Sequence, residues 1–310
     1  MSDIIDVAEA YGKTLVDLGE EDPRIVVLDA DIPDSCRSEE FHKRFPERAF
    51  DVGVAEASMV SLGVGLALAG KIPFVNTFAS FITSRAFDQN RVSVAYGRAN
   101  VKLVGAASGL SLGYAGPSHH SIEDIAIMRA LPNIVILVPA DSTETRQMVR
   151  SAAYHEGPVY LRLSRTFTPP IYDGSYHFEL GKAVTLRSGE DVSLIASGDM
   201  VAKALAAAER LIEDGIKAEV LNVHTIKPID VESIVLSARK TGAVITAEEH
   251  NVVGGLGSAV AEVLAEHAPA PMRRVGIRDT FTESDDTEIL RTAYHLNISD
   301  IVAAAKELVG

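Results

Sequence analysis

The sequence predicts an α/β protein with two doubly wound domains and mainly parallel sheets. Short β-branched runs alternate with amphipathic segments along the whole chain, as strands and helices do in parallel sheets. The alternation is interrupted once, by a stretch with two adjacent prolines and no helical period over residues 166–189. The 310 residues, 47% hydrophobic and 23% charged, suffice for two soluble domains. We therefore predict domains over 1–165 and 191–310, joined by a linker over 166–190.

Composition excludes several classes of function. A net charge of −14 argues against nucleic acid as a partner, because phosphate binding needs clustered Lys and Arg. No apolar run is long enough to cross a membrane, and the first nine residues are too acidic and too short for a signal peptide, so we expect a cytoplasmic protein. Cys36 is the single cysteine, which excludes a disulfide framework or a thiolate metal cluster. As a catalytic nucleophile it is disfavoured, since it lies in a polar segment with only His42 nearby.

The first predicted domain begins with an amphipathic helix that carries Tyr11, Leu15 and Leu18 on one face. The strand that follows, over 24–28, ends in Asp29-Ala30-Asp31, and polar residues at such an edge often face a ligand. A polar segment with a short helix comes next. The remaining elements alternate: a helix from Glu56, strand 73–78, helix 83–96, strand 101–106, helix 122–130, strand 134–139, helix 143–155 and strand 159–163.

Glu56 stands at the head of an apolar, Gly- and Ala-rich segment. Leucines and small residues recur after it at helical spacing, which predicts that Met59, Leu62, Leu66 and Ala69 form a buried helix face. A carboxylate at such a helix start is costly unless it is paired, hydrogen-bonded or functional. From these residues alone two interpretations stay open: Glu56 caps its own helix, or it takes part in chemistry.

A Gly-rich loop, SGLSLGYAGPSHHS over 108–121, is the second informative feature. Its glycines permit unusual turns and a close approach to a ligand. Ser121 is a candidate cap for the helix that follows. The adjacent histidines, His119 and His120, do not form a chelating pair of the HExxH kind, and a solvated loop histidine is the simplest interpretation of either.

The second predicted domain repeats the alternation. Its elements are strand 192–196, helix 201–214, strand 218–221, helix 231–240, strand 243–247, a helix after Gly257, strand 272–277 and helix 298–308. The glycines of 254–257 are compatible with an anion at a helix N-terminus, although ordinary turn geometry explains them as well. The nucleotide-binding motifs GxGxxG after a strand and GxxxxGK[ST] do not occur.

Five segments carry a resemblance to a known family: VVLDADIPDS, DVGVAEASM, FVNTFASF, GPSHHSIEDIA, and TIKPID with AEEHNVVGGLGSAVAE. In order and spacing the chain resembles the C-terminal half of a transketolase, that is, the pyrimidine-binding domain followed by the transketolase C-terminal domain, as in split two-subunit transketolases. The last pair, TIKPID with AEEHNVVGGLGSAVAE, favours transketolase over the beta subunits of 2-oxoacid dehydrogenases. Deoxyxylulose-phosphate synthase shares much of the pattern, so it resembles the chain more than those beta subunits do.

The resemblance implies thiamine diphosphate as cofactor and the transfer of a two-carbon ketol unit from a ketose to an aldose through an enamine on that cofactor. Glu56 matches the glutamate that hydrogen-bonds the aminopyrimidine ring. Phe81 and Phe78 match aromatics that stack on that ring, and Asp31 and Ile32 match positions that line the thiamine. On the substrate side, His119, Arg165 and Ser35 match a histidine, a phosphate-binding arginine and a nearby serine.

Three positions depart from the family pattern on the substrate side. Ala8 replaces an arginine of the first helix, Ala115 an aspartate two residues before the proline of the loop motif, and Ala107 a histidine earlier in that loop. The thiamine half of the site is therefore kept while the sugar-phosphate half is altered. An unusual or differently bound ketose is expected, which leaves the donor, the acceptor and the need for a phosphate open.

The family's diphosphate-binding domain, with its GDG…N metal motif, does not occur in these 310 residues. We therefore expect a separate N-terminal subunit that holds Mg²⁺ (or Ca²⁺), an α2β2 assembly, and no metal site in this chain. Two alternatives remain: a deoxyxylulose-phosphate-synthase-like or 2-oxoacid-decarboxylating subunit, and a non-catalytic regulatory subunit of the same fold. His250 and Lys227 also match the family, and for them we expect structural roles.

Overall fold

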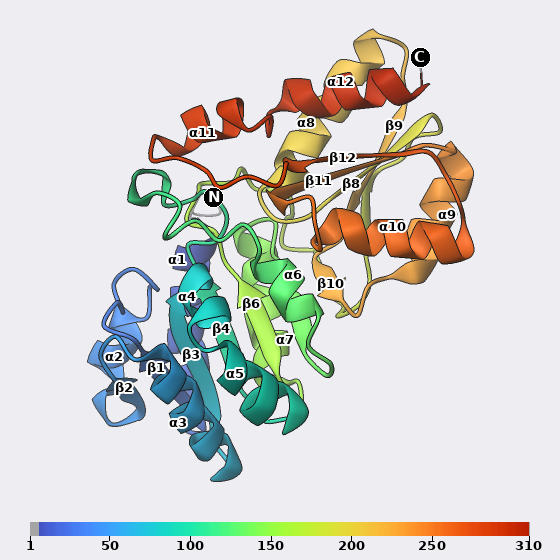
Figure 1. Ribbon diagram of the computed structural model, residues 1–310. Coiled ribbons are helices and arrows are strands. Elements are labelled where there is room, and N and C mark those ends of the chain that lie inside the picture. The colour runs from blue at the N-terminus through green and yellow to red at the C-terminus, as the bar shows by residue number, and fades with distance from the viewer. Residues whose placement is uncertain (1–5, 310) are drawn as a thin grey trace.

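The computed structural model describes residues 6–309, which form two α/β units, each built on its own sheet (Figure 1). Seven strands form the first sheet, in the order β10 (Thr225–Lys227), β5 (Val135–Leu137), β6 (Val159–Arg162), β4 (Lys102–Ala106), β3 (Ile72–Phe78), β1 (Ile25–Asp29) and β2 (Ala49–Asp51). Five form the second: β12 (Met272–Ile277), β11 (Val244–Asn251), β8 (Val192–Ala196), β9 (Ala218–Asn222) and β7 (Val184–Arg187). All neighbours are parallel except the edge pairs β10–β5 and β7–β9. The predicted fold class is confirmed.

Helices cover both faces of the first sheet. On one face lie α1 (Val7–Glu21) and α7 (Ser142–Tyr154), and on the other α3 (Glu56–Leu68), α4 (Ala79–Ser84), α5 (Phe87–Gln89) and α6 (Asp124–Arg129). Successive side chains of a strand point to opposite faces, so a strand covered on both sides is apolar throughout. In β1, Val26 and Leu28 pack toward α3 while Ile25 and Val27 pack toward α1. This explains the unbroken apolar run IVVL.

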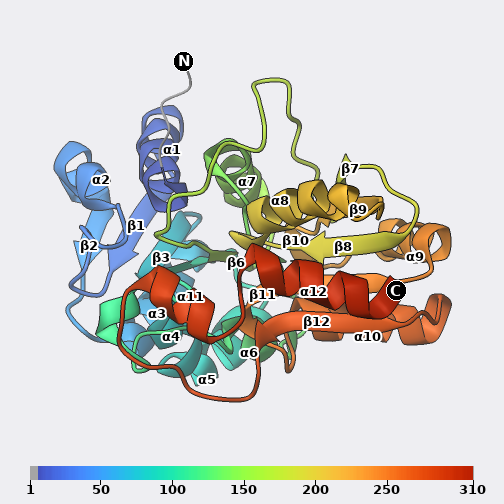
Figure 2. The same ribbon diagram turned by 90° about the horizontal axis from the view of Figure 1, so that it is seen from above.

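The second sheet is covered in the same way. Helices α8 (Met200–Glu213) and α12 (Ile298–Val309) pack together on one face, and α9 (Val231–Thr241) and α10 (Leu256–His267) on the other. The remaining helix, α11 (Thr287–Ala293), extends over the first unit (Figure 2), while its Leu290 belongs to the apolar cluster of the second sheet. Apolar residues of α6, α9 and α10 belong to one buried cluster, so the two units share a core.

Several predicted elements differ from the observed ones. The helix expected over 83–96 consists of the end of α4, then α5 and a π-helix over Asn90–Tyr96. The side chain of Asn90 donates to the carbonyl of Ile82 at 2.7 Å, and this side chain–backbone bond replaces regular helical pairing at the break. The helix expected from residue 122 begins at Asp124. Ser121 does not cap it, since its backbone forms an isolated bridge with Gly109 and its hydroxyl is buried without a partner among residues 6–309.

The buried face predicted for α3 is also wrong in part. Met59 is buried, but Leu62 is 43% exposed, and the residues that face the core are Glu56, Met59, Val60 and Gly63. This helix is apolar on nearly every side, so its periodicity cannot select the face that packs inward. The far side of α3 is left as exposed apolar surface, including Leu68 at 82%.

The segment predicted as a linker contains a strand. Residues 184–187 form β7, which pairs antiparallel with β9 at the edge of the second sheet. Its side chains are only partly buried, so it lacks the apolar run by which a strand is recognised. The short strands β2 and β10 and the helix α11 were likewise not predicted, because each has too few residues for a period. The division of the chain at residues 165 and 190 stays a prediction.

Candidate active site

The site residues predicted from the sequence all follow the carboxyl ends of parallel strands. Such ends meet at one edge of a sheet, where open α/β proteins bind ligands. The residues are Asp31, Ile32 and Ser35 after β1, Glu56 after β2, Phe78 and Phe81 at and after β3, His119 in the loop after β4, and Arg165 after β6. The topology thus brings segments that are far apart in the sequence to one edge of the first sheet.

Glu56 is the first residue of α3 and is 4% exposed. Among residues 6–309 its one hydrogen-bond partner is Arg85, whose Nη1 donates to Oε1 at 2.8 Å. The carboxylate accepts no backbone N–H of α3, so the capping interpretation fails. Its Oε2 has no partner in the described part of the chain and remains available for a ligand.

Three aromatic rings stand together beside this ion pair. The centroids of Phe78 and Phe81 are 5.7 Å apart, and the imidazole of His119 lies 5.0 Å from Phe81 and 5.7 Å from Phe78. The guanidinium of Arg85 lies 3.7 Å from the centre of the Phe81 ring, so Arg85 connects Glu56 to the aromatic cluster. All three rings are partly exposed. The sequence did not single out Arg85, because its partner lies 29 residues earlier in the chain.

Two buried hydroxyls flank the same aromatic segment. Thr77 Oγ1 and Ser80 Oγ have no hydrogen-bond partner among residues 6–309. Buried polar atoms are rarely left unpaired, and those that are commonly await a ligand or a water. The described residues thus leave two hydroxyls of this segment unpaired, beside a carboxylate oxygen of Glu56 without a partner and three partly exposed rings.

The loop after β1 is fixed from beneath by Asp29. This buried carboxylate accepts the Ser38 hydroxyl at 2.7 Å and is hydrogen-bonded to His42 Nε2 at 2.7 Å. Burial raises the pKa of Asp29, and the hydrogen bond to Asp29 raises the pKa of His42. Asp31 takes a left-handed backbone (φ 66°) and donates its N–H to Asp51 Oδ1 at 3.0 Å. Ser38 and His42 are supports that the sequence did not reveal.

Cys36 is buried in the same loop, and burial raises its thiol pKa well above the ordinary value. A buried thiol of raised pKa is a poor nucleophile, as expected from the sequence. The positive charge of Arg165 acts in the opposite direction on this pKa. Of the three departing alanines, Ala8 and Ala107 are buried and Ala115 is exposed.

The glycine loop before α10 does not offer an anion site. The carboxylate of Glu248 accepts the N–H groups of Leu256 and Gly257 at 2.7 and 2.8 Å, so the helix N-terminus is already occupied by the protein's own acid. A Cβ on Gly255 would lie 2.0 Å from Glu248 Oε2, which explains the glycine by close packing. His250 and Lys227, for which the sequence predicts structural roles, make hydrogen bonds within the fold. The former accepts the Ala126 N–H at 3.4 Å, and the latter donates to the Leu131 carbonyl at 2.5 Å.

Within residues 6–309 no group of three or more His, Cys, Asp or Glu side chains is arranged to hold a metal ion. None of the described helices is both long and apolar enough to span a bilayer.

A buried acid and a ring cluster lie at the carboxyl edge of a doubly wound sheet that is joined to a second α/β unit, and this is the edge at which α/β enzymes of this class bind their ligands. Two family models match the chain: the pyrimidine-binding domain of transketolase over residues 3–170, and the transketolase C-terminal domain over 181–301. The chain therefore belongs to the transketolase family, and it is a thiamine-dependent subunit of the ketol-transferring type.

Individual relatives agree. The chain is 47% identical to a 6-deoxy-6-sulfo-D-fructose transketolase subunit of Clostridium sp., over 97% of this chain and 93% of the relative. It is 37% identical to an apulose-4-phosphate transketolase subunit of Phocaeicola vulgatus, over 99% of both chains. A solved structure of a split-gene transketolase, described as an inactive beta4 tetramer, superposes with a TM-score of 0.92 at 48% identity over 98% of each chain.

Proposed function

We propose that this chain is the C-terminal-type subunit of a split transketolase, which transfers a two-carbon ketol unit from a ketose to an aldose. The observation that carries the proposal is Glu56, buried at the head of α3 with one carboxylate oxygen available and aromatic rings beside it. Thiamine diphosphate supplies an electron sink for the carbanion left by carbon–carbon cleavage. In the proposal Glu56 holds a proton on the pyrimidine ring, beside the rings of Phe78 and Phe81.

The remaining thiamine contacts are proposed from the match of these residues to the family. Phe78 and Phe81 would stack on the pyrimidine, and Asp31 and Ile32, on the loop braced by Asp29, would line the thiamine. Arg85 holds the Glu56 carboxylate in place through Oε1, which leaves Oε2 for the ring.

On the substrate side, His119 would hydrogen-bond an oxygen of the donor, while Arg165 and Ser35 would bind its far end. The relatives named above act, by their names, on a sulfonated ketose and on a ketose phosphate. Both molecules carry an anion, which a guanidinium binds well. We therefore propose a ketose donor with a terminal anionic group, bound without the contacts that Ala8, Ala107 and Ala115 would have supplied.

We further propose that the diphosphate and its Mg²⁺ (or Ca²⁺) are held by a separate N-terminal subunit in an α2β2 assembly. Exposed apolar side chains of α3 and the π-helix support a partner at this face: Leu62 (43%), Leu68 (82%), Val92 (45%) and Tyr96 (84%). Apolar surface that gathers on one face is typical of interfaces.

The test is turnover of the purified chain mixed with an N-terminal transketolase subunit, thiamine diphosphate and Mg²⁺, across ketoses with and without a terminal phosphate or sulfonate. Glu56→Gln should lower kcat by about 10²- to 10⁴-fold, since positioned proton transfer contributes that much. The matched control is Glu9→Gln, a first-turn glutamate of α1 that is 44% exposed, which should leave kcat unchanged.

Three contrary outcomes would each contradict a different part of the proposal. Turnover by the chain without a partner would overturn the split assembly. Decarboxylation of pyruvate in place of ketol transfer would identify a decarboxylating relative. Cofactor binding without turnover of any donor would favour a regulatory subunit.

A further inference from the structure

The second sheet also forms a crevice of the kind in which open α/β sheets bind ligands, and in this chain the protein's own side chains fill it. The chain runs from β8 to β9 on one side and then to β11 and β12 on the other, so the strand order reverses between β8 and β11. At such a reversal, open α/β sheets form a crevice at the carboxyl ends of the strands. Asp199 follows β8, and Glu249 lies on β11 at this point. The cavity left here is about 10 Å³, too small for any ligand.

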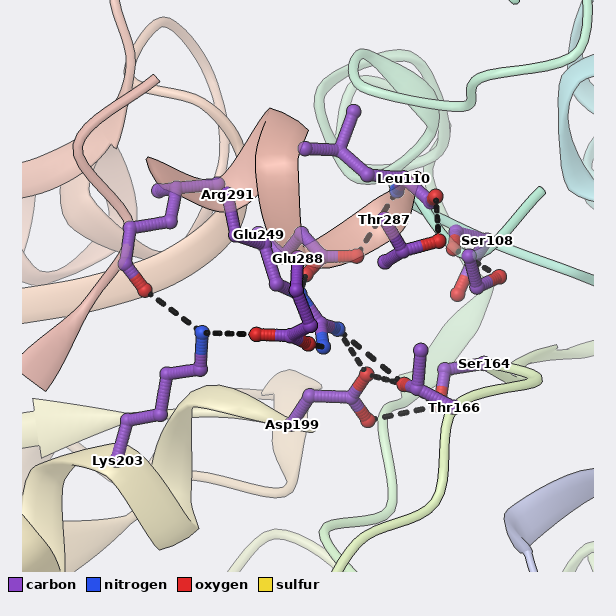
Figure 3. A network of polar contacts seen from close by, with 12 residues as sticks. Ser108, Leu110, Ser164, Thr166, Asp199, Lys203, Glu249, Thr287, Glu288 and Arg291 are labelled. Carbon is purple, nitrogen blue, oxygen red and sulfur yellow. Dashed lines mark hydrogen bonds and ion pairs between the residues drawn. The ribbon is translucent and has the colours of Figure 1, made fainter. Parts of the chain in front are cut away.

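Arg291 of α11 fills the crevice (Figure 3). Its Nε donates to Glu249 Oε2 at 2.5 Å and its Nη2 to Asp199 Oδ2 at 2.8 Å. Its Nη1 donates to Glu288 at 2.6 Å. The side chains of Arg291, Glu249 and Asp199 are all 5–6% exposed, whereas that of Glu288 is 66% exposed. Burial lowers the pKa of Arg291, but the charges of Glu249 and Asp199 outweigh it and raise this pKa above its usual value.

The first unit reaches into this cluster through the Gly-rich loop. Glu249 Oε1 accepts the N–H of Leu110 at 2.8 Å, and Thr287 Oγ1 donates to the carbonyl of Leu110 at 3.1 Å. The backbones of Gly109 and Ser121 pair in both directions at 3.0 and 3.1 Å, which closes the loop at its base. His119 lies within the loop closed in this way.

The far end of the loop is held by the second unit too. His120, next to His119, is buried, with Nδ1 hydrogen-bonded to Thr282 Oγ1 at 2.6 Å and Nε2 donating to the Gly113 carbonyl at 3.1 Å. Burial lowers the pKa of His120, so the imidazole stays neutral at pH 7. The second unit therefore holds the loop at Leu110 and again at His120.

A second segment of the first unit is held by Asp199. Its carboxylate accepts the Ser164 hydroxyl at 2.7 Å and also the Thr166 hydroxyl, and these two residues flank Arg165 (Figure 3). Arg291 adds a bond from Nη2 to Thr166 Oγ1 at 3.2 Å. The buried guanidinium of Arg291 is thus linked through Glu249 to the His119 loop and through Asp199 to the segment that carries Arg165.

We propose that Arg291, Glu249 and Asp199 are positioning residues that hold the His119 loop and the Arg165 segment in their relative places. Open α/β sheets bind a ligand in such a crevice. In this chain the crevice instead holds the segments of the first unit that carry His119 and Arg165. The second unit then controls donor binding without contacting the donor. This inference rests on the proposed function for the roles of His119 and Arg165, but not for the positioning.

Positioning is tested on the full chain by hydrogen–deuterium exchange. Asp199→Ala should speed exchange of the amides of 164–167, and Glu249→Ala those of 109–113, each by about threefold or more, while β3 and β4 keep their protection, since local openings differ between segments. Glu249→Gln keeps one acceptor oxygen, for Leu110, but loses the one for Arg291, so its loop protection should lie between that of Glu249→Ala and the wild type. Glu288→Ala, the exposed carboxylate on the same guanidinium, is the matched control and should change neither segment.

The consequence is tested on the complex with its partner subunit. Asp199→Ala should raise KM about tenfold for a ketose with a terminal phosphate, and much less for the same ketose without one, because small displacements of a binding group have large effects. Asp199→Asn keeps an acceptor for Ser164, so its KM should lie between those of Asp199→Ala and the wild type.

The two readouts separate the possible failures. If the wild-type complex turns over no ketose, the proposed function fails, while the exchange data still decide the positioning. Exchange that is unchanged, or faster throughout the molecule, overturns the inference. An equal rise in KM for the ketose with the phosphate and the ketose without it, in Asp199→Ala, also overturns the inference.

Discussion

Gly109 shows at the scale of a single residue how the loop depends on its neighbour in the other unit. Its φ is +63°, and a Cβ built on it would lie 2.4 Å from Glu249 Oε1. Gly215 has a similar φ of +77° with open space around it. Gly215→Ala should therefore lower the free energy of unfolding by about 1 kcal/mol, the cost of left-handed backbone alone. Gly109→Ala adds a clash with the acceptor of Leu110 and should cost at least about 2 kcal/mol.

Urea denaturation of the two variants beside the wild type measures both costs. Equal losses in the two proteins would show that Glu249 moves aside freely and that the contact does not constrain the loop.

Candidate site residues that lie within family-like motifs could be named from the sequence, and their roles stay predictions; the residues that support them could not be named. Glu56, Phe78, Phe81 and His119 stand close to one another in the structure, as the resemblance implied. Arg85 and Arg291 could not be found in this way, since each is an ordinary helix residue until the fold brings its acids to it. Arg291 lies 42 residues from Glu249 and 92 from Asp199, and no local spacing encodes such contacts.

At the scale of elements, the linker is fastened to the first unit by the start of α7. Asp141 caps this helix and also accepts the N–H groups of Ile171 and Tyr172 at 2.8 Å. The next acid, Glu144, is fully buried and accepts the hydroxyl of Tyr176 at 2.7 Å and the amide of Asn222 at 2.9 Å. The chain between the two units is thus tied at several points to one helix end.

Glu144 should make stability depend on pH. Burial raises its pKa from 4.5 to about 7, so the folded state binds this proton more tightly than the unfolded chain. Its contribution is therefore full below about pH 4.5 and is lost as pH rises through about 7, with a size of about 3 kcal/mol at most. Glu144→Gln, which stays neutral, should remove this part of the slope when the free energy of unfolding is measured from pH 5 to 8.

The exposed Glu9→Gln serves as the control, and its slope should match that of the wild type. A Glu144→Gln protein with the wild-type slope would mean that Glu144 does not titrate in this range.

The same scale shows why some elements could be predicted and others could not. Strands such as Val192–Ala196 lie where the sequence places them, because burial on both faces demands an unbroken apolar run. The edge strands β7 and β10 owe their existence to pairing with β9 and β5, partners that only the fold supplies. In α3, apolar residues on every side hid the choice of the buried face, and the same property leaves a surface for a partner.

At the scale of the whole molecule, the two units are joined as closely as one domain. The strand β10 belongs by sequence to the second unit but completes the first sheet by pairing with β5. From β10, Lys227 Nζ donates to the carbonyls of Arg129 and Leu131 at 2.8 and 2.5 Å, and Arg129 in turn donates to the Gly254 carbonyl at 2.7 Å. A single apolar cluster runs beneath these contacts.

Because sheet, core and polar contacts all cross the boundary, the chain should unfold in one cooperative transition, although it contains two family domains. Scanning calorimetry should give a single peak whose calorimetric and van't Hoff enthalpies agree per cooperative unit. Lys227→Met leaves two carbonyls without their donor and should lower the temperature of that one peak by about 3 °C, as expected for a loss near 2 kcal/mol in a chain of this size. Lys13→Met, at a side chain that is 55% exposed and paired with Glu9, should leave the peak in place. Two separate peaks in the wild type would show that the units unfold independently, and so would a Lys227→Met protein in which only part of the transition moves. In either case the second unit could not position the site residues of the first.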